Sequence, residues 1–321
     1  VRKGIVLLLA LGLVTLWGCP KRPGAQTVDR PRHIYITDTG NNRLVRIDDV
    51  SGKGWTSLGS TASTEANHFD KPQGLYVDEN EPSHIYVADT GNCRIVRMDD
   101  MTGANWEIFG RRGDGASQFN QPTGIFVDGS DHLHVADRNN DRIATTDDMT
   151  GTHWLELGKQ GSGENQFSYP NAIFVDPSEH MYVADSNNIP AKVVNNRIVR
   201  MDDMYGLNWI SYKGSFARPS GIFVDHANHI YVTDSLNDNL SRMDDMHGKN
   251  LVTLGGPGGT RLRFNQPGGV FVDDDGHIYV ADTGNDRIVR MDDMTGRGWV
   301  TFGTPGKGVN QLDSPCGVFV R

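Results

Sequence analysis

The chain consists largely of one segment repeated six times, with a period of about 50 residues. The run His-Ile-Tyr-Ile-Thr-Asp at 33–38 returns in related form at 84–89, 132–137, 180–185, 229–234 and 277–282. Successive copies of its final aspartate are separated by 51, 48, 48, 49 and 48 residues. A repeat of this length is one supersecondary unit that packs against its neighbours. The chain must therefore fold as an array of similar modules.

Each copy contains four short runs of alternating apolar residues, separated by Gly, Asp and Asn clusters. Such runs are typical of antiparallel strands, and four strands per unit at this period predict a β-propeller. A Pro-x-Gly-type strand occurs six times, at 72–77, 122–127, 170–175, 219–224, 267–272 and 315–320. The last of these strands has no partner near it in sequence, whereas the first copy at 33–38 lacks an inner strand. The sequence therefore predicts an all-β, six-bladed β-propeller of four-stranded antiparallel blades, closed by pairing the C-terminal strand with the N-terminal blade.

The repeated residues resemble a known family. The motif Val-Ala-Asp-x-Gly-Asn-x-Arg-Ile, at 87–95 and 280–288, is similar to the NHL repeat, and the resemblance covers about residues 33–320. It implies a six-bladed propeller. It implies much less about activity, because similar propellers include peptide-amidating lyases, lactonase-like and streptogramin-lyase-like enzymes, RNA-binding regions and extracellular sensor domains.

The first 19 residues have the pattern of a bacterial export signal. Arg2 and Lys3 precede the apolar run 5–18, which is short for a membrane span. The run ends in Leu-Trp-Gly-Cys at 16–19, which resembles the lipobox of bacterial lipoproteins. The resemblance implies cleavage before Cys19 and lipidation of its thiol. An ordinary secretory signal and an uncleaved anchor are the alternatives.

These patterns divide the chain into a signal peptide at 1–18, a Pro-rich polar linker at 19–32 and the propeller at 33–321. We expect a monomer that is exported in bacteria and attached to the membrane by its lipid, on the periplasmic or cell-surface side.

The charge balance is acidic, with 31 Lys and Arg against 40 Asp and Glu and a net charge of −9. Nucleic-acid binding depends on a basic surface, so we expect no nucleic-acid partner. Twelve of the acidic residues form one pair per copy before a Gly-bearing turn, where carboxylates accept backbone hydrogen bonds. We predict turn chemistry rather than calcium binding for these pairs, which are Asp48-Asp49, Asp99-Asp100, Asp147-Asp148, Asp202-Asp203, Asp244-Asp245 and Asp292-Asp293.

Three further sets of repeated residues are predicted to build the blades. An Asp and an Arg bracket one loop in each copy and can pair and cap its free N–H groups; they are Asp38, Asp89, Asp137, Asp185, Asp234 and Asp282 with Arg43, Arg94, Arg142, Arg197 and Arg287, Asn239 replacing the arginine in the fifth copy. One histidine per copy is predicted to lie on the rim, at the same end as the aspartate pairs and too far from the others to share a metal ion; these are His33, His84, His132, His180, His229 and His277. Tryptophans on the fourth strand are predicted to pack between blades: Trp55, Trp106, Trp154, Trp209 and Trp299.

A binding site should lie where the copies differ. The position between Pro and Gly of the inner strand carries a different small or polar residue in every copy, and we expect it to face the channel mouth at the loop-rich end; it is occupied by Gln73, Thr123, Asn171, Ser220, Gly268 and Cys316. The fourth copy also has seven extra residues in its Asp-to-Arg loop, including Ile189 and Lys192, whereas the next interblade connection is shorter by the same number. The longer loop is either a lid over the mouth or a compensating change.

Catalytic residues are not evident. No inner strand begins with His, Glu or Lys, so we predict no catalytic residue, no metal site and no cofactor, with a calcium or zinc ion in the channel left as an open alternative. A disulfide between Cys93 and Cys316 is also left open. The function that the sequence favours is a binding or scaffold protein for a peptide, protein or cell-envelope ligand. The alternative is a lyase-type or lactonase-type enzyme with a metal ion at the channel mouth.

Overall fold

The computed structural model describes residues 32–78, 83–186, 195–256 and 262–321. These residues belong to one compact unit, Pro31–Arg321. The predicted signal peptide, Cys19 and most of the predicted linker lie outside the described residues, as do Ile189 and Lys192 in the fourth copy. Among the described residues, no helix is long and apolar enough to cross a membrane.

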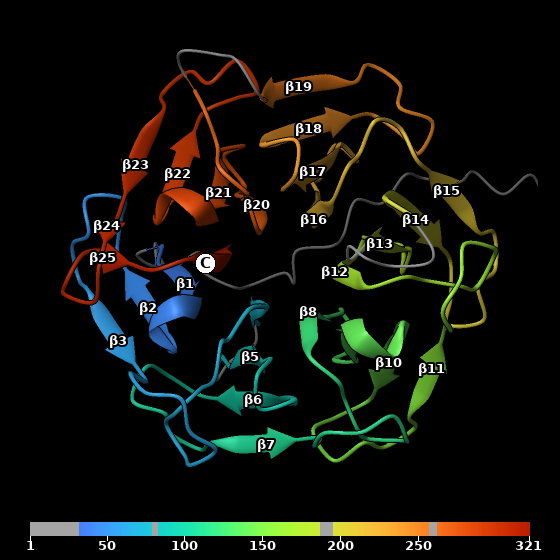
Figure 1. Cartoon of the computed structure of the whole chain (residues 1–321), viewed down its shortest axis with the longest axis horizontal. Helices are drawn as coiled ribbons and strands as arrows, with labels where there is room; N and C mark the ends of the chain where they lie inside the picture. The colour runs from blue at the N-terminus through green and yellow to red at the C-terminus, as the bar shows by residue number, and fades with distance from the viewer. Residues whose placement is uncertain (1–31, 79–82, 187–194, 257–261) are drawn as a thin grey trace, which may run out of the picture. The chain divides into compact units, whose positions relative to one another are not determined.

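Six four-stranded antiparallel sheets are arranged as blades around a central channel (Figure 1). From the innermost strand outward, the first three blades are β26 (Pro315–Val320), β1 (Ile34–Asp38), β2 (Arg43–Ile47) and β3 (Thr56–Leu58); β4 (Leu75–Val77), β5 (Ile85–Asp89), β6 (Arg94–Met98) and β7 (Glu107–Phe109); and β8 (Pro122–Val127), β9 (Leu133–Asp137), β10 (Arg142–Thr146) and β11 (Leu155–Leu157). The other three are β12 (Pro170–Val175), β13 (Met181–Asp185), β14 (Arg197–Met201) and β15 (Ile210–Tyr212); β16 (Pro219–Val224), β17 (Ile230–Asp234), β18 (Asn239–Met243) and β19 (Val252–Gly255); and β20 (Val270–Val272), β21 (Ile278–Asp282), β22 (Arg287–Met291) and β23 (Val300–Phe302). This architecture confirms the predicted six-bladed propeller.

Short elements complete the ring. Three 3-10 helices, η1 (Thr39–Asn41), η2 (Arg138–Asn140) and η3 (Thr283–Asn285), turn the chain between the second and third strands of their blades. A parallel pair, β24 (Thr304–Pro305) and β25 (Gln311–Leu312), lies in the connection that leads to β26.

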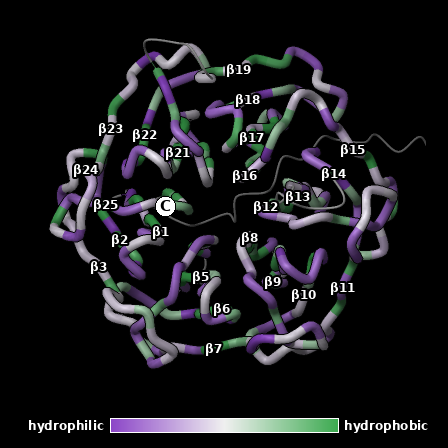
Figure 2. Tube along the Cα trace, in the orientation of Figure 1, coloured by the Kyte–Doolittle hydropathy of each residue, from purple (hydrophilic) through white to green (hydrophobic). Residues whose placement is uncertain are grey.

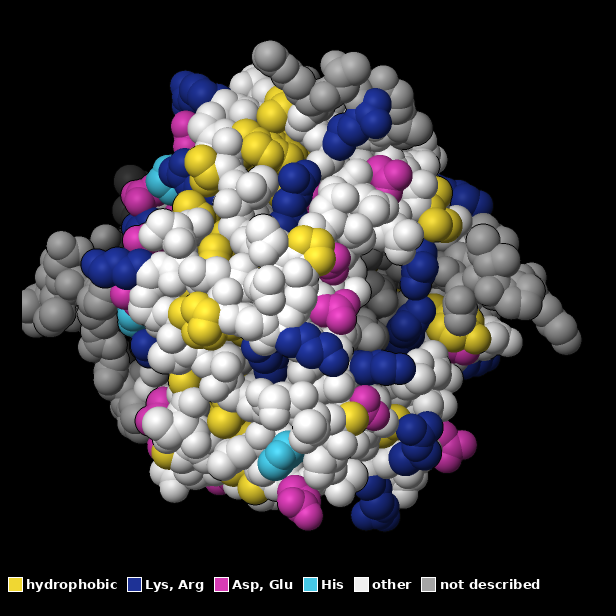
Figure 3. Space-filling model, turned by 60° about the vertical axis from the view of Figure 1, so that its left-hand side comes forward, with side chains coloured by type: hydrophobic (Ala, Val, Ile, Leu, Met, Phe, Trp, Pro, Cys, Tyr) yellow, Lys and Arg dark blue, Asp and Glu magenta, His cyan; other side chains and the backbone are white. Residues whose placement is uncertain are grey.

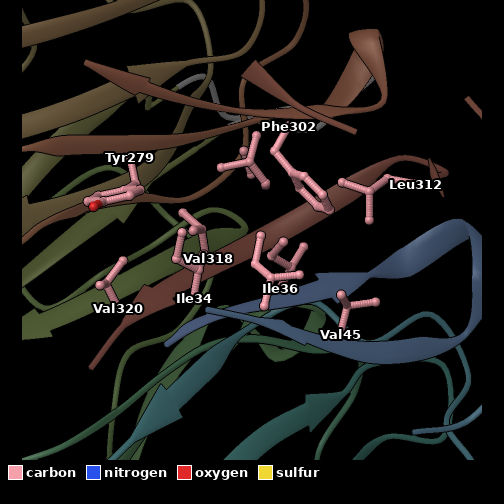
Figure 4. Close-up of a cluster of buried hydrophobic side chains, with 11 residues drawn as sticks. Ile34, Ile36, Val45, Tyr279, Phe302, Leu312, Val318 and Val320 are labelled. Atoms are coloured by element: carbon pink, nitrogen blue, oxygen red, sulfur yellow. The ribbon is translucent and has the colours of Figure 1, made fainter. Parts of the chain in front are cut away.

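The ring is closed by the two ends of the repeat region, as predicted. β26 pairs antiparallel with β1, so that Val320 lies opposite Ile34 and Val318 opposite Ile36. Figure 4 shows the buried cluster at this junction, where side chains of β1 and β26 meet Phe302 and Leu312 from the end of the chain's sixth copy. Closure pairs the C-terminal strand β26 with β1, so neither strand is left with an unpaired edge at this junction that would favour aggregation.

The core consists of six hydrophobic clusters, each built from two neighbouring blades. In Figure 2, hydrophobic stretches recur in every blade and hydrophilic stretches lie in the loops that join the strands. The tryptophans contribute to these clusters as predicted; Trp106, for example, lies 5.1 Å from the ring of Phe69 in the connection before β4. One detail of the prediction was wrong, since each tryptophan lies directly before the fourth strand rather than on it.

Candidate functional site

The repeated Asp and Arg residues join adjacent blades at the loop-rich end. In blade 2, Arg94 Nε donates to Asp89 Oδ2 at 2.7 Å, and the outer guanidinium nitrogens donate to the carbonyls of Thr64 and His68 in the preceding interblade connection. The same carboxylate–guanidinium contact of 2.7–2.9 Å recurs for Asp38–Arg43, Asp137–Arg142, Asp185–Arg197 and Asp282–Arg287. In blade 5, Asn239 stands opposite Asp234 in the strand register.

The second carboxylate oxygen of each of these aspartates has a different hydrogen-bond donor from the one predicted. It accepts a hydrogen bond from the interblade connection, as Asp89 Oδ1 does from the N–H of Asp70 at 2.7 Å, and not from its own loop. The loop closes itself instead, because Asn42 N–H donates to the carbonyl of Thr39. Burial raises the pKa of Asp89, while hydrogen bonds from Asn92, Asp70 and Arg94 oppose that rise.

The opposite end of the ring repeats one aspartate–histidine contact in five of the six blades. In blade 1, Arg321 stands at the position of the aspartate, and His33 lies 3.1 Å from Asp48 instead. His180 Nδ1 lies 2.8 Å from Asp176 Oδ2, the Tyr182 hydroxyl donates to the same oxygen at 3.2 Å, and His180 Nε2 lies 3.7 Å from Asp202 of the turn pair. We call this the Asp–His end. The second aspartate of each pair accepts turn N–H groups, as Asp100 does from Thr102, so the predicted turn role is present.

Two carboxylate–histidine groups at the Asp–His end have spacings that a metal ion would need. One is Asp128, His132 and His134, and the other is Asp273, Asp275 and His277. The first is explained without a metal: His134 takes the place of the network tyrosine and lies 2.9 Å from Asp128 Oδ2 and 2.9 Å from Thr145 Oγ1. In the second, Arg32 pairs with both carboxylates. We therefore interpret both groups as variants of the repeated network.

The channel opens at the loop-rich end into a cavity of about 310 Å³, which we call the funnel. All six residues of the variable inner-strand position contact it or stand in its wall: Gln73, Thr123, Asn171, Ser220, Gly268 and Cys316. The structure thus brings together the residues that the sequence placed at the channel mouth. Figure 3 shows a hollow in this part of the ring with Lys and Arg side chains beside it.

Several of these polar residues also hold neighbouring blades together. Asn171 Nδ2 donates to the carbonyl of Ser220 at 2.7 Å, and the Ser220 hydroxyl donates to the carbonyl of Pro267 at 2.6 Å. Thr123 is 2% exposed and its hydroxyl points to the carbonyl of Pro170. Thr123 is therefore a wall residue, whereas Gln73 and Asn171 remain partly exposed.

A circle of six aromatic side chains, one from each inner strand, narrows the channel one residue beyond the funnel wall. Adjacent ring centroids lie 4.7–5.2 Å apart in a closed circuit formed by Tyr76, Phe126, Phe174, Phe223, Phe271 and Phe319. Six points in a regular hexagon lie as far from its centre as from one another, so each ring lies about 5 Å from the channel axis. We call this ring the collar. The collar lies between the funnel and the Asp–His end and narrows the channel there. A ligand therefore enters the funnel from the loop-rich end.

Sequence reasoning missed two arginines in the funnel wall. Arg138 lies in η2 of blade 3, and Arg218 lies directly before β16 of blade 5. Neither stands at the inner-strand position on which the prediction was based. For Arg138 the signal was present, because the other five copies carry Ser or Thr at its position, whereas the position of Arg218 differs in nearly every copy and gave no such signal.

The two described cysteines do not form a disulfide. Cys93 is buried and its Sγ accepts the N–H of Gln121 at 3.4 Å, whereas Cys316 lies in the funnel wall with Sγ 3.8 Å from Gln73 Oε1. Burial raises the pKa of the Cys316 thiol despite the nearby Arg138 and Arg218, so it is protonated at neutral pH and a weak nucleophile.

Comparison with known proteins supports the repeat assignment. A family model described as the NHL repeat matches residues 264–291. Residues 264–291 are thus similar to an NHL repeat. Together with the six-bladed ring, this match supports an NHL-repeat propeller.

Two curated proteins are similar to part of the chain. NHL repeat-containing protein 3 of Mus musculus is 31% identical over 121 residues, which is 32% of this chain and 35% of that protein. The probable peptidyl-alpha-hydroxyglycine alpha-amidating lyase pgal-1 of Caenorhabditis elegans is 32% identical over 109 residues, which is 33% of this chain and 29% of that protein. The matched regions thus span about a third of each relative.

Solved structures share the fold over most of the ring. A chain of a nidogen/laminin complex has a TM-score of 0.69 at 17% identity, covering 90% of this chain and 98% of its own length. A streptogramin B lyase has a TM-score of 0.58 at 16% identity, and the virginiamycin B lyase of Staphylococcus aureus one of 0.57 at 14%; each covers 86% of this chain, with 80% and 82% of their own lengths. At these identities the likeness shows the fold alone.

Proposed function

We propose that the protein is an exported, lipid-anchored propeller that binds a peptide, protein or cell-envelope ligand in the funnel. The observation that carries this proposal is the convergence of the non-repeating residues on one cavity, while the repeated residues build the blades. A concave site with a few polar groups on an apolar wall is the usual form of a ligand pocket. Here Gln73 and Asn171 supply amides, and Leu75, Ile125 and Ile173 supply apolar surface.

The side chains that line the funnel favour binding over catalysis. Among the described residues that line the funnel, the polar side chains are amides, hydroxyls, a thiol and two guanidinium groups, with no His, Asp or Glu. General acid–base catalysis and zinc ligation draw mainly on those missing side chains. The fold likeness to a chain of a nidogen/laminin complex is consistent with a propeller that binds another protein.

An enzyme of lyase type is the second candidate, because a named amidating lyase and two named streptogramin-type lyases are similar to the chain. This candidate predicts a stoichiometric metal ion or a turnover that depends on funnel residues. Elemental analysis of purified residues 20–321 separates the two candidates. Zinc or calcium at one ion per chain, lost on chelation together with ligand binding, would favour the enzyme.

The membrane anchor is tested separately from the ring. We expect the full chain, expressed in a bacterial host, to incorporate labelled palmitate and to sediment with membranes. Cys19→Ala should remove the label, because the acylated thiol is absent. Equal labelling of the C19A variant, or a soluble and unlabelled native chain, would contradict the anchor.

The funnel is tested by filling it. Residues 20–321 are screened against an immobilised library of short peptides, and the best binder is then titrated against Asn171→Trp and Gln73→Trp. We expect each variant to lose at least tenfold in affinity at a temperature well below melting, since the added indole occupies the cavity. Q73W should keep the native melting temperature, whereas N171W should melt lower because it loses the Asn171–Ser220 hydrogen bond. Val300→Trp, which adds the same bulk on the outer strand β23, is the matched control and should bind normally. Normal binding by N171W and Q73W would remove the funnel as the site.

A further inference from the structure

Two arginines flank the mouth of blade 4. Arg138 precedes this blade in the ring and Arg218 follows it, and both side chains line the funnel. The described funnel lining contains no carboxylate, so these charges meet no acidic partner there. The chain as a whole is acidic, with a net charge of −9, so two arginines in one cavity without a carboxylate differ from the overall charge of the molecule.

Arg138 occupies a position that elsewhere joins neighbouring blades. In four other blades the residue after the repeated aspartate is a Ser or Thr whose hydroxyl donates to the Pro carbonyl of the next inner strand; these are Thr39, Thr90, Ser186 and Thr283. Arg138 cannot make this bond in the same way, and Thr123 donates to Pro170 in its place. The blade-joining bond is thus kept by another residue, which leaves the guanidinium of Arg138 for a different role.

Arg218 also departs from its position in the other blades. The residue before the inner-strand proline has a positive φ of 47–57° in five blades, at Lys71, Gln121, Tyr169, Gln266 and Ser314. Arg218 does not, and its N–H donates to Asp234 Oδ1 of its own blade. The cause is the short connection between Gly214 and Pro219, which the sequence showed to be truncated. The truncation therefore gives Arg218 a different path from that of its counterparts.

The two guanidinium groups act on each other. Arg138 Nε is buried without a hydrogen-bond partner among the described residues. Burial and the charge of Arg218 lower the pKa of Arg138, although arginine stays protonated. The guanidinium of Arg138 also stacks over the Tyr169 ring at 5.9 Å. Two like charges in a partly buried site are unfavourable, and an anion between them would relieve that repulsion.

We propose that Arg138 and Arg218 form a clamp for an oxyanion, a carboxylate or a phosphate, carried by the ligand of the funnel. Guanidinium groups donate paired hydrogen bonds to both anions. The amide of Asn171, in blade 4, lies between the two arginines along the ring, and Ser220, two residues after Arg218, lines the same wall. This assignment rests on the proposed funnel site and adds the chemical class of its ligand.

A purely structural role for the arginines makes the opposite prediction for stability. If Arg138 served to hold the blades together, Arg138→Gln would lower the melting temperature. If it forms an anion clamp, R138Q in an anion-poor buffer should melt at the same temperature or higher, because one of two repelling charges is gone. Arg218→Gln should behave in the same way.

The binding test uses three probes at constant ionic strength: inorganic phosphate, a tripeptide with a free C-terminal carboxylate, and the same tripeptide as its C-terminal amide. We expect phosphate or the carboxylate peptide to bind and to raise the melting temperature of residues 20–321. R138Q and R218Q should each lower that affinity about tenfold or more, since a hydrogen bond to a charged group is lost. Arg111→Gln, which removes an exposed arginine from an interblade connection, is the matched control and should change nothing.

The outcomes separate the two proposals. Phosphate binding without carboxylate binding assigns a phosphorylated ligand, and the reverse assigns an acid such as a peptide C-terminus. Binding of the peptide amide that is lost in N171W but kept in R138Q and R218Q would overturn the clamp and leave the funnel proposal standing. Failure of all three probes to bind, or binding that none of these variants alters, would overturn the clamp, and an unaltered N171W would overturn the funnel as well.

Discussion

The two ends of the channel are built from the same six repeats but differ in how far the repeats agree. At the Asp–His end, the same aspartate–histidine contact recurs in five blades, as in Asp176–His180 and Asp225–His229, and His33 of blade 1 contacts Asp48 instead. At the loop-rich end, the residues around the funnel differ from blade to blade, and Arg138 and Arg218 each occur once. A contact repeated in five of six blades stabilises the ring itself, whereas a ligand without sixfold symmetry is bound best by a wall that differs from blade to blade.

The comparison also holds within one loop. Asp137 is part of the repeated Asp–Arg contact and is fully buried, and the next residue, Arg138, is unique and faces the funnel. Adjacent residues can therefore have unrelated roles, and what separates them is whether the other blades carry the same side chain.

The largest effect is expected at a repeated contact of the loop-rich end. Asp89→Ala should lower the free energy of unfolding by about 3–5 kcal/mol, because it leaves buried Arg94 without its carboxylate. Asp234→Ala is the matched control, since Asn239 replaces the arginine there, and should cost about 1–3 kcal/mol for the lost hydrogen bonds alone. Urea unfolding measures both, and equal losses would mean that the ion pair adds nothing.

A smaller effect is expected at the Asp–His end. Asp176→Ala should destabilise the ring by about 2 kcal/mol, because His180 and Tyr182 lose a buried acceptor. Its affinity for a funnel ligand should match that of the native chain, since the collar lies between the two regions. A loss of affinity in D176A at a temperature far below melting would break the proposed separation of the ends.

The smallest effect concerns pH and blade 3. Burial acts to raise the pKa of Asp128, but hydrogen bonds from His134 and His132 prevail and hold it well below its usual range. A carboxyl group with a depressed folded-state pKa stabilises the fold above its unfolded pKa of about 4, and this stability is lost as the pH falls further. Between pH 5 and pH 2, Asp128→Asn should therefore lose less stability than the native chain. Asp225→Asn, at a carboxylate that faces one histidine, is the control, and parallel pH profiles for D128N and the native chain would contradict the account.

Much of the fold could be predicted from the sequence because the same pattern of strands and turns occurs in six copies. The repeat period predicted the extent of each blade, and the four alternating runs in each copy predicted the strands. The unpaired inner strand at 315–320 predicted the closure with β1. Agreement among copies cancels the ambiguity that a single short strand would have.

The site was predicted less completely for the same reason. Alignment of the copies picked out Gln73 and Asn171, which do line the funnel. It did not pick out Arg138 or Arg218, because whether a loop residue reaches the cavity depends on turns such as the truncated connection before Pro219. The collar was missed because Phe174 and its counterparts look like ordinary core residues until the ring brings them around one axis.

The most direct measurement is a crystal of residues 20–321 soaked in selenate, whose anomalous signal locates bound oxyanions. We expect a selenium peak within hydrogen-bond distance of both Arg138 and Arg218 in the funnel, and its loss in the R138Q crystal. Selenate bound elsewhere on the ring, with an empty funnel, would contradict the claim that the non-repeating end is built to hold a ligand.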